Sequence, residues 1–252
     1  MKDFQKKIAV TAALSVMLLT LFSSCKNDPD NNSTTTEPYS YNSAQSTTGS
    51  SSAASEDPEK PFAVNTSWQK NYRVTYEYYN SADGTNTVTV KETKNKTAFT
   101  AEYPDGDSLL YYKENGSDTD YYVIMTGKEK KAVHTLLENK SFSELNSTFM
   151  KLTKVSSNLP SLSNVLYMYD ENIGGRACRK YLQRAYSGGK LTESVYIWID
   201  IEFGFAAKCE SYNADNKMTV MWSVKEFEAG AVPEDGIKPD LSQYTVTEEE
   251  KS

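Results

Sequence analysis

Few side chains in this sequence have the types and spacing that chemistry needs. The only histidine, His134, stands in a predicted strand without a second residue at metal-ligand spacing, so we expect no metal site. No Gly-x-Ser-x-Gly elbow occurs, and Cys178 and Cys209 lack the setting of an activated thiol. Acidic residues are numerous but lie mostly in predicted turns and in Glu248–Glu250. The sequence alone does not exclude that two of these carboxylates form a catalytic pair. We therefore expect a protein that is not an enzyme and has no cofactor.

Cys25 is the cysteine whose neighbours predict a modification. A lysine-rich start is followed by an apolar run over residues 8–22, which is too short to span a membrane comfortably. Two serines then precede Cys25, and small residues before a cysteine are what lipoprotein signal peptidase accepts. We expect residues 1–24 to be a lipoprotein signal peptide and Cys25 to carry a diacylglyceryl group, whose two acyl chains anchor the protein in a membrane. The alternative is an ordinary secretory signal with an unrelated cysteine.

A polar tract follows Cys25. Residues 25–60 are rich in Ser, Thr, Asn, Asp and Pro, and their few apolar residues show no period, so we expect a disordered tether. Loss of residues 1–24 removes three lysines and one aspartate, which moves the formal charge from −7 to −9. A chain this acidic, with no basic patch, is a poor candidate for binding nucleic acid.

Four successive strands with short turns are predicted over residues 174–227. In residues 195–201 aliphatic side chains alternate with aromatic or acidic ones, which is the pattern of a strand with two different faces. Gly188 and Gly189 form a tight hairpin turn, because two adjacent glycines adopt positive φ at little steric cost.

This turn predicts the register of the central hairpin. A two-residue loop places Leu182 opposite Val195 on one face and Arg179 opposite Trp198 on the other. If the sheet is curled, the first of these faces is concave, and it would hold a hydrophobic ligand. The residues predicted to line this hydrophobic cavity come from three strands: Leu182, Val195, Ile197, Ile199, Val220 and Trp222.

The fold class follows from the number of strands. We expect one domain over residues 61–252, with a short acidic tail, and six further strands before residue 138. Ser141 and Glu144 form a capping-box pattern at the start of the one strong helix, and a second short helix is indicated around residues 62–69. One or two helices cannot cover such an antiparallel meander. We therefore expect a mainly β (α+β) domain whose sheet curls into an incomplete barrel closed by these helices.

The same central strands carry a resemblance to a known family. It rests on four segments: Gly174-Gly175-x-x-Cys178-x-x-Tyr181, Tyr196–Asp200, Gly204–Ala206 and Lys225–Phe227. In these segments the chain resembles the LolA-like lipoprotein carriers and their relatives, including LolB and the LppX/LprG-type lipid-binding lipoproteins, loosely over residues 68–244 and better over 173–244. The resemblance implies an incomplete barrel with helices closing its open side.

Cys178 and Cys209 invite a disulfide, since exported proteins meet oxidising conditions. The predicted register opposes it, because a third strand separates the two cysteines by about 9–10 Å, and a disulfide needs Cα atoms within about 7 Å. A bulge would be needed to bring them together, so this pairing stays open.

Two functions fit these observations. The first is a membrane-anchored envelope lipoprotein that binds or carries a lipid or another hydrophobic ligand. The second is a non-carrier envelope protein that uses a filled scaffold to bind a protein or glycan, or for a structural role. In both cases we expect a monomer outside the cytoplasm. In a two-membrane cell Lys26 would favour the outer membrane, because it is not the aspartate associated with inner-membrane retention in the LolA-type system.

Overall fold

The computed structural model describes Asp57, Lys60 and residues 62–81, 84–114, 118–126, 130–136, 141–145, 165–230 and 232–249. The predicted signal peptide, Cys25 and almost all of the predicted tether lie outside these residues. So does the predicted helix beyond residue 145. None of the described helices is long and apolar enough to cross a membrane.

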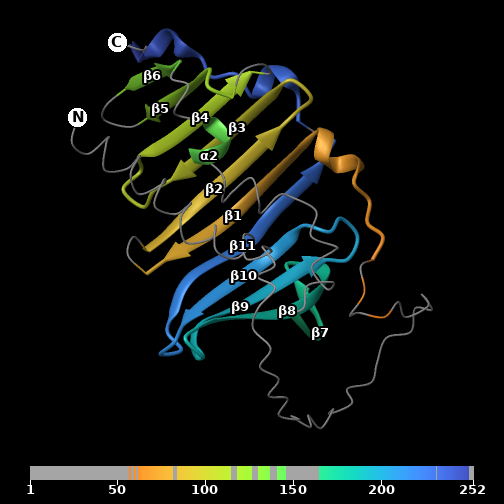
Figure 1. The fold of residues 1–252 in the computed structure, drawn as a ribbon. Coiled ribbons are helices and arrows are strands. Elements are labelled where there is room, and N and C mark those ends of the chain that lie inside the picture. Colours follow the sequence, from red (N-terminus) through yellow and green to blue (C-terminus); the bar gives the residue numbers. More distant parts are fainter. Residues whose placement is uncertain are drawn as a thin grey trace.

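The described strands form one twelve-stranded sheet in the order β12-β6-β5-β4-β3-β2-β1-β11-β10-β9-β8-β7 (Figure 1). Neighbouring strands are antiparallel except β12 and β6, which are parallel. The strands are β1 Tyr72–Asn80, β2 Gly84–Glu92, β3 Lys96–Glu102, β4 Ser108–Glu114, β5 Tyr121–Thr126, β6 Lys131–Thr135, β7 Val165–Ile173, β8 Arg176–Ser187, β9 Lys190–Asp200, β10 Ala206–Asn213, β11 Met218–Ala229 and β12 Thr245–Glu249.

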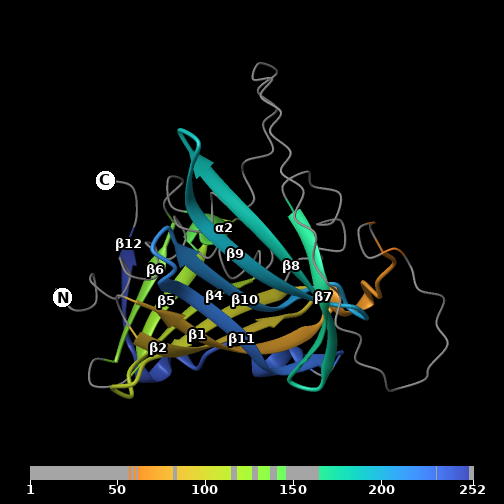
Figure 2. The same ribbon diagram turned by 90° about the horizontal axis from the view of Figure 1, so that it is seen from below.

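The sheet is curled but does not close. Figure 2 shows β8 and β9 rising on one side of the curve and β5 and β6 on the other. Strand β1 pairs with β11, so the first strand lies beside the next-to-last strand in the middle of the sheet. The predicted mainly β fold with an incomplete barrel is therefore confirmed.

Short helices contact both faces of this sheet. Helix α2, Phe142–Leu145, begins where the capping box predicted, and the Phe142 ring packs edge-on against Phe99 and Tyr121 on the concave face. The second helix, predicted around residues 62–69, is found as the shorter 3₁₀ helix η1, Ser67–Lys70. Two more 3₁₀ helices, η3 Glu234–Gly236 and η4 Leu241–Gln243, belong to the C-terminal segment.

The C-terminal segment covers the convex face of β3 and β4. Val232 and Ile237 form a second apolar cluster there with Ala98 and Tyr112. After η4 the chain adds β12 to the edge of β6, so the predicted acidic tail is partly a strand. The first and larger apolar cluster of the domain lies mainly on the opposite, concave face.

The register of the central hairpin differs from the prediction by one residue. Gly188 and Gly189 do form the two-residue turn, with φ of 57° and 75°, and Ser187 pairs with Lys190. A β-bulge between Ala185 and Tyr186 then shifts the pairing. An extra residue on one strand reverses the face of every residue beyond it, so the prediction was wrong from the bulge onward.

Candidate functional site

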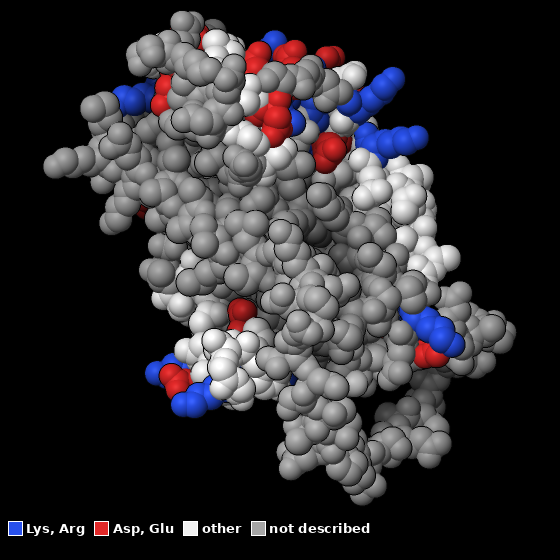
Figure 3. All heavy atoms as spheres, in the orientation of Figure 1, with Lys and Arg blue, Asp and Glu red and all other residues white. Residues whose placement is uncertain are grey.

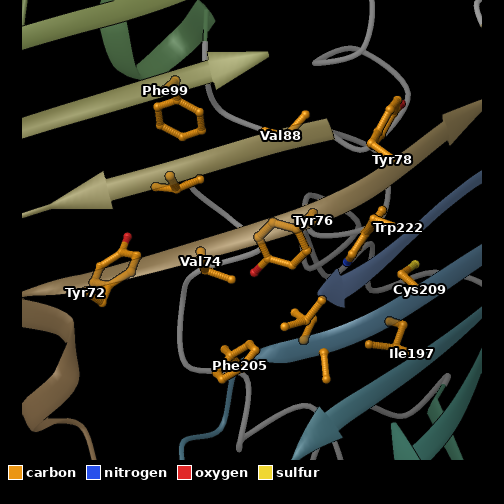
Figure 4. Close-up of a cluster of buried hydrophobic side chains, with 14 of the residues drawn as sticks. Tyr72, Val74, Tyr76, Tyr78, Val88, Phe99, Ile197, Phe205, Cys209 and Trp222 are labelled. Atoms are coloured by element: carbon orange, nitrogen blue, oxygen red, sulfur yellow. The ribbon is translucent and has the colours of Figure 1, made fainter. Parts of the chain in front are cut away.

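The concave face of β9, β10 and β11 is built from rows of apolar side chains. Ile197 pairs with Cys209, and Cys209 pairs with Trp222, so these three residues form one row across the sheet. Val195 and Val220 flank Ser211 in the next row. All of these side chains are buried, and Figure 4 shows Ile197, Cys209 and Trp222 on the same side of their strands.

The rows continue onto the N-terminal half of the sheet. Tyr78 pairs with Trp222, and Val74 pairs with Val90, which in turn pairs with Phe99. Strand β1 supplies a line of buried aromatic rings to this face because its tyrosines stand at alternate positions, and aromatic residues favour a pleated surface. The concave face is therefore one apolar surface that runs from β9 to at least β3.

The structure places the predicted cavity residues in two groups. Val195, Ile197, Ile199, Val220 and Trp222 do share the concave face. Leu182 does not, because the bulge pairs it with Tyr196 on the convex face. Its predicted place opposite Val195 is taken by Gln183, and the neighbouring Tyr181, which is fully buried, pairs with Ile197.

The same shift brings Arg179 onto the concave face, where it pairs with Ile199 instead of Trp198. Arg179 is only 8% exposed, and its Nε and Nη1 atoms have no hydrogen-bond partner in the described part of the chain. Its guanidinium carbon lies 4.5 Å from the centre of the Phe62 ring. Burial raises the pKa of Tyr181 to about 12, although the charge of Arg179 and a side-chain hydrogen bond with Arg179 act in the opposite direction.

A second arginine of β8 has a complete set of partners. The Arg176 Nε atom donates to the Oδ2 atom of buried Asp200 at 2.6 Å. The Oδ1 atom of Asp200 accepts from the backbone N–H groups of Glu202 and Phe203 in the turn between β9 and β10. The Arg176 guanidinium also packs over the rings of Phe203, Phe205 and Phe227. We call this group, together with Trp68 of η1, the base cluster.

The convex face of the same strands carries a different arrangement. Lys180 packs its Nζ atom 4.5 Å from the centre of the Trp198 ring and donates a hydrogen bond of 2.8 Å to the Tyr169 hydroxyl. The Trp198 indole N–H donates to Glu171 at 2.7 Å. Each polar group named here has a partner, in contrast to Arg179.

The two cysteines of the domain are free thiols, so the disulfide left open by the sequence is absent from this structure. Cys209 shares the concave face with Ile197, whereas Cys178 pairs with Asp200 on the other face. Burial raises the pKa of Cys178 to about 12 and that of Cys209 well above its usual value. Neither thiol has the lowered pKa of a reactive cysteine.

His134 joins the two strands at one edge of the sheet. Its Nδ1 atom lies 2.7 Å from Glu248 of β12, its Nε2 atom lies 2.8 Å from Asp120, and its ring stacks on Tyr122. Burial acts to lower the pKa of His134, but the two carboxylates outweigh it, so the pKa is raised. Among the described residues no group of three or more potential ligands is arranged to hold a metal ion.

Charged side chains of both signs lie next to one another at the edge near β5 and β6, on the face drawn in Figure 3. Two ion pairs of the described residues involve strand β4, namely Lys113 with Asp118 and Glu114 with Lys238. This mixture is a salt-bridged surface, and the described residues on this face do not form a single basic patch.

Several solved structures are similar to this chain at low sequence identity. No family model matches the sequence, and no curated protein sequence matches it. Solved structures do match. LprF from Mycobacterium bovis has 10% identity and a TM-score of 0.41, with 68% of this chain and 90% of that chain covered. A LolA superfamily protein from Nitrosomonas europaea has 8% identity and a TM-score of 0.27, with 69% and 92% covered.

The structure of the Pseudomonas aeruginosa MucA/MucB complex also matches, with 13% identity and a TM-score of 0.37. The match covers 68% of this chain but only 56% of the matched chain. Proteins of the kinds that the sequence resemblance named are thus found among the matches, all with TM-scores below 0.5. At these identities and TM-scores, no ligand or partner can be transferred to this chain.

Proposed function

We propose that this protein is a membrane-anchored envelope lipoprotein that binds or carries a lipid or another hydrophobic ligand on the concave face of its sheet. The observation that carries the proposal is the continuous apolar surface from Ile197 through Trp222 to Phe99 on a sheet that does not close. An open curled sheet offers such a surface to an acyl chain, whereas a closed small barrel fills its own interior. No catalytic role is part of this proposal.

The anchor in this proposal is a diacylglyceryl group on Cys25. The lysine-rich start, the apolar run and the two serines before Cys25 support it. The intact mass of detergent-extracted protein should show loss of residues 1–24 and an added acyl mass. A Cys25→Ala protein should leave the membrane fraction or accumulate unprocessed. A fully processed Cys25→Ala protein that stays on the membrane would show that the anchor lies elsewhere.

Extraction of bound lipid tests the carrier function. The mature chain from residue 25, with Cys25→Ser to prevent acylation, should be purified without detergent and examined by native and lipid mass spectrometry. We expect an amphiphile bound in near-stoichiometric amount. Cys209→Phe, which adds a ring to the concave face, should release it, whereas Lys208→Met on the convex face of the same strand should not. Protein that is free of lipid in all three forms would contradict the proposal.

One observation favours a protein partner as the second candidate. Strand β7 is the last strand of the described sheet, and Leu166 and Tyr169 on it are 54% and 45% exposed. An edge strand with exposed apolar side chains can pair with an extended peptide. On this reading the concave face is packed core and the ligand-extraction experiment finds nothing.

A further inference from the structure

The concave face contains one cation whose position the apolar rows do not explain. Arg179 is more than nine-tenths buried, and three of its N–H donors, those on Nε and Nη1, find no acceptor in the described part of the chain. Asp170, its cross-strand neighbour on β7, is exposed, and no described ion pair joins the two residues. Although Arg179 has a side-chain hydrogen bond with Tyr181, buried polar groups in native proteins are almost always paired, so the two unpaired nitrogen atoms indicate a missing acceptor.

The surroundings of Arg179 favour an anionic acceptor that is attached to an apolar chain. The guanidinium lies over the Phe62 ring, and a guanidinium that packs on a ring still has N–H donors in its own plane for an acceptor. Directly across the strand pair is Ile199, and one row further along are Tyr181 and Ile197. An anion bound at Arg179 therefore has buried hydrophobic side chains on the adjoining concave face.

A second donor lies on the same face. Trp222 is 2% exposed, and its indole Nε1 atom has no hydrogen-bond partner in the described part of the chain. Trp222 belongs to the row of Ile197 and Cys209, which starts at Tyr181 beside Arg179. A ligand that extends from Arg179 along this row would bring polar atoms near an unused N–H donor.

We propose that Arg179 binds the anionic head group, a carboxylate or a phosphate, of an amphiphile whose acyl chain lies along the Ile197 row. A guanidinium binds either group through two parallel N–H···O bonds, and a charge-assisted hydrogen bond in a buried setting is among the strongest that proteins make. This inference rests on the proposed function, and it narrows the ligand from any hydrophobic molecule to one with a single acidic head group.

Binding of two ligands with the same chain tests the inference. The mature chain with Cys25→Ser, freed of lipid, should be titrated with oleate and with oleyl alcohol, which differ in the head group. We expect oleate to bind about tenfold more tightly than the alcohol. Arg179→Met should abolish this preference while leaving the affinity for the alcohol unchanged, Arg179→Lys should retain part of it, and Lys208→Met, which removes a cation from the convex face, should retain all of it.

The outcomes separate the inference from the proposed function. If the unsubstituted chain binds neither ligand, both fail. If it binds the alcohol as tightly as oleate, or if Arg179→Met binds oleate unchanged, the carrier function stands and the head-group assignment is overturned. Inorganic phosphate at millimolar concentration should not raise the melting temperature; an Arg179-dependent rise would identify a free anion as the ligand and overturn the amphiphile. If Arg179→Met is the only variant whose melting temperature falls by more than about 5 °C, Arg179 has a structural role and the inference is also overturned.

Discussion

Two arginines of β8, three residues apart, have opposite surroundings. In the base cluster, Arg176 donates to buried Asp200 at 2.6 Å and packs over three phenylalanine rings. On the concave face, Arg179 packs over one ring, and two of its nitrogen atoms have no hydrogen-bond partner in the described part of the chain. The buried carboxylate of the base cluster is paired within the chain, whereas the concave face keeps unpaired donors on Arg179 and Trp222.

On our proposal, this difference separates a structural cation, Arg176, from a ligand-binding cation, Arg179. Asp200 accepts from two backbone N–H groups as well as from Arg176, so that carboxylate and the turn between β9 and β10 stabilise each other. A buried charge with matched partners holds a fold in one arrangement. A buried charge without them destabilises the fold, and its presence favours a role in binding.

The largest expected effect contrasts the two arginines directly. Arg176→Met leaves the Asp200 carboxylate buried without its cation, and we expect a loss of about 3 kcal/mol in the free energy of unfolding. Arg179→Met removes an unpaired charge and should leave that free energy unchanged or higher. Urea unfolding of both variants checks the contrast. Equal losses would show that the two arginines are both structural.

The aromatic ring beside Arg179 gives a smaller effect. Phe62→Leu keeps most of the buried volume but removes the ring over the guanidinium, and a cation–ring contact contributes about 2 kcal/mol when it is desolvated. A double-mutant cycle of Phe62→Leu with Arg179→Met should therefore show a coupling free energy of that size. A coupling free energy of zero would mean that Phe62 does not orient the guanidinium.

His134 extends the comparison to a cation whose partners are mostly exposed. Its pKa is raised above 6.5 by Asp120 and Glu248, so its contribution to stability is fully present below about pH 6.5 and is lost as the pH rises through the raised pKa. Tyr122, stacked on the ring, stays neutral in this range because its pKa is raised. The melting temperature of His134→Gln should fall below that of the unsubstituted chain by more at about pH 6 than at about pH 9. A difference that grows with pH would contradict this.

The smallest effect comes from an exposed ion pair on the same sheet. Lys225 and Glu77 lie 3.0 Å apart with side chains 53% and 37% exposed. Water screens such a pair, so Lys225→Ala should change the free energy of unfolding by less than about 0.5 kcal/mol. Chemical denaturation measures this value, and a loss as large as that of Arg176→Met would remove the distinction between buried and exposed pairs.

Sequence periodicity predicted the sheet, its curl and most of the concave face, because alternation along residues 195–201 decides which side chains share a face. It did not predict Arg179. The Gly188–Gly189 turn was placed correctly, but the bulge at Ala185 and Tyr186 has no marker in the sequence. A bulge is favoured by the twist and packing of the whole sheet, which a local pattern does not encode. The helix after Ser141 was predicted by its capping box, and its first turn is described.

The most direct test of ligand binding on the concave face is Ile197→Asp, with melting temperature and uptake of a hydrophobic fluorescent probe measured on the same protein. Ile197 lies in the middle of the row between Tyr181 and Cys209 and is 3% exposed. If this face receives an acyl chain, the carboxylate should abolish probe uptake. The cost in melting temperature should be modest, because water enters the site when no acyl chain is bound and hydrates the carboxylate. If the face is packed core, the buried carboxylate should lower the free energy of unfolding by several kcal/mol. Loss of uptake by a protein that still melts cooperatively is the result we predict, and a collapse of stability in a chain that never bound the probe would contradict the account.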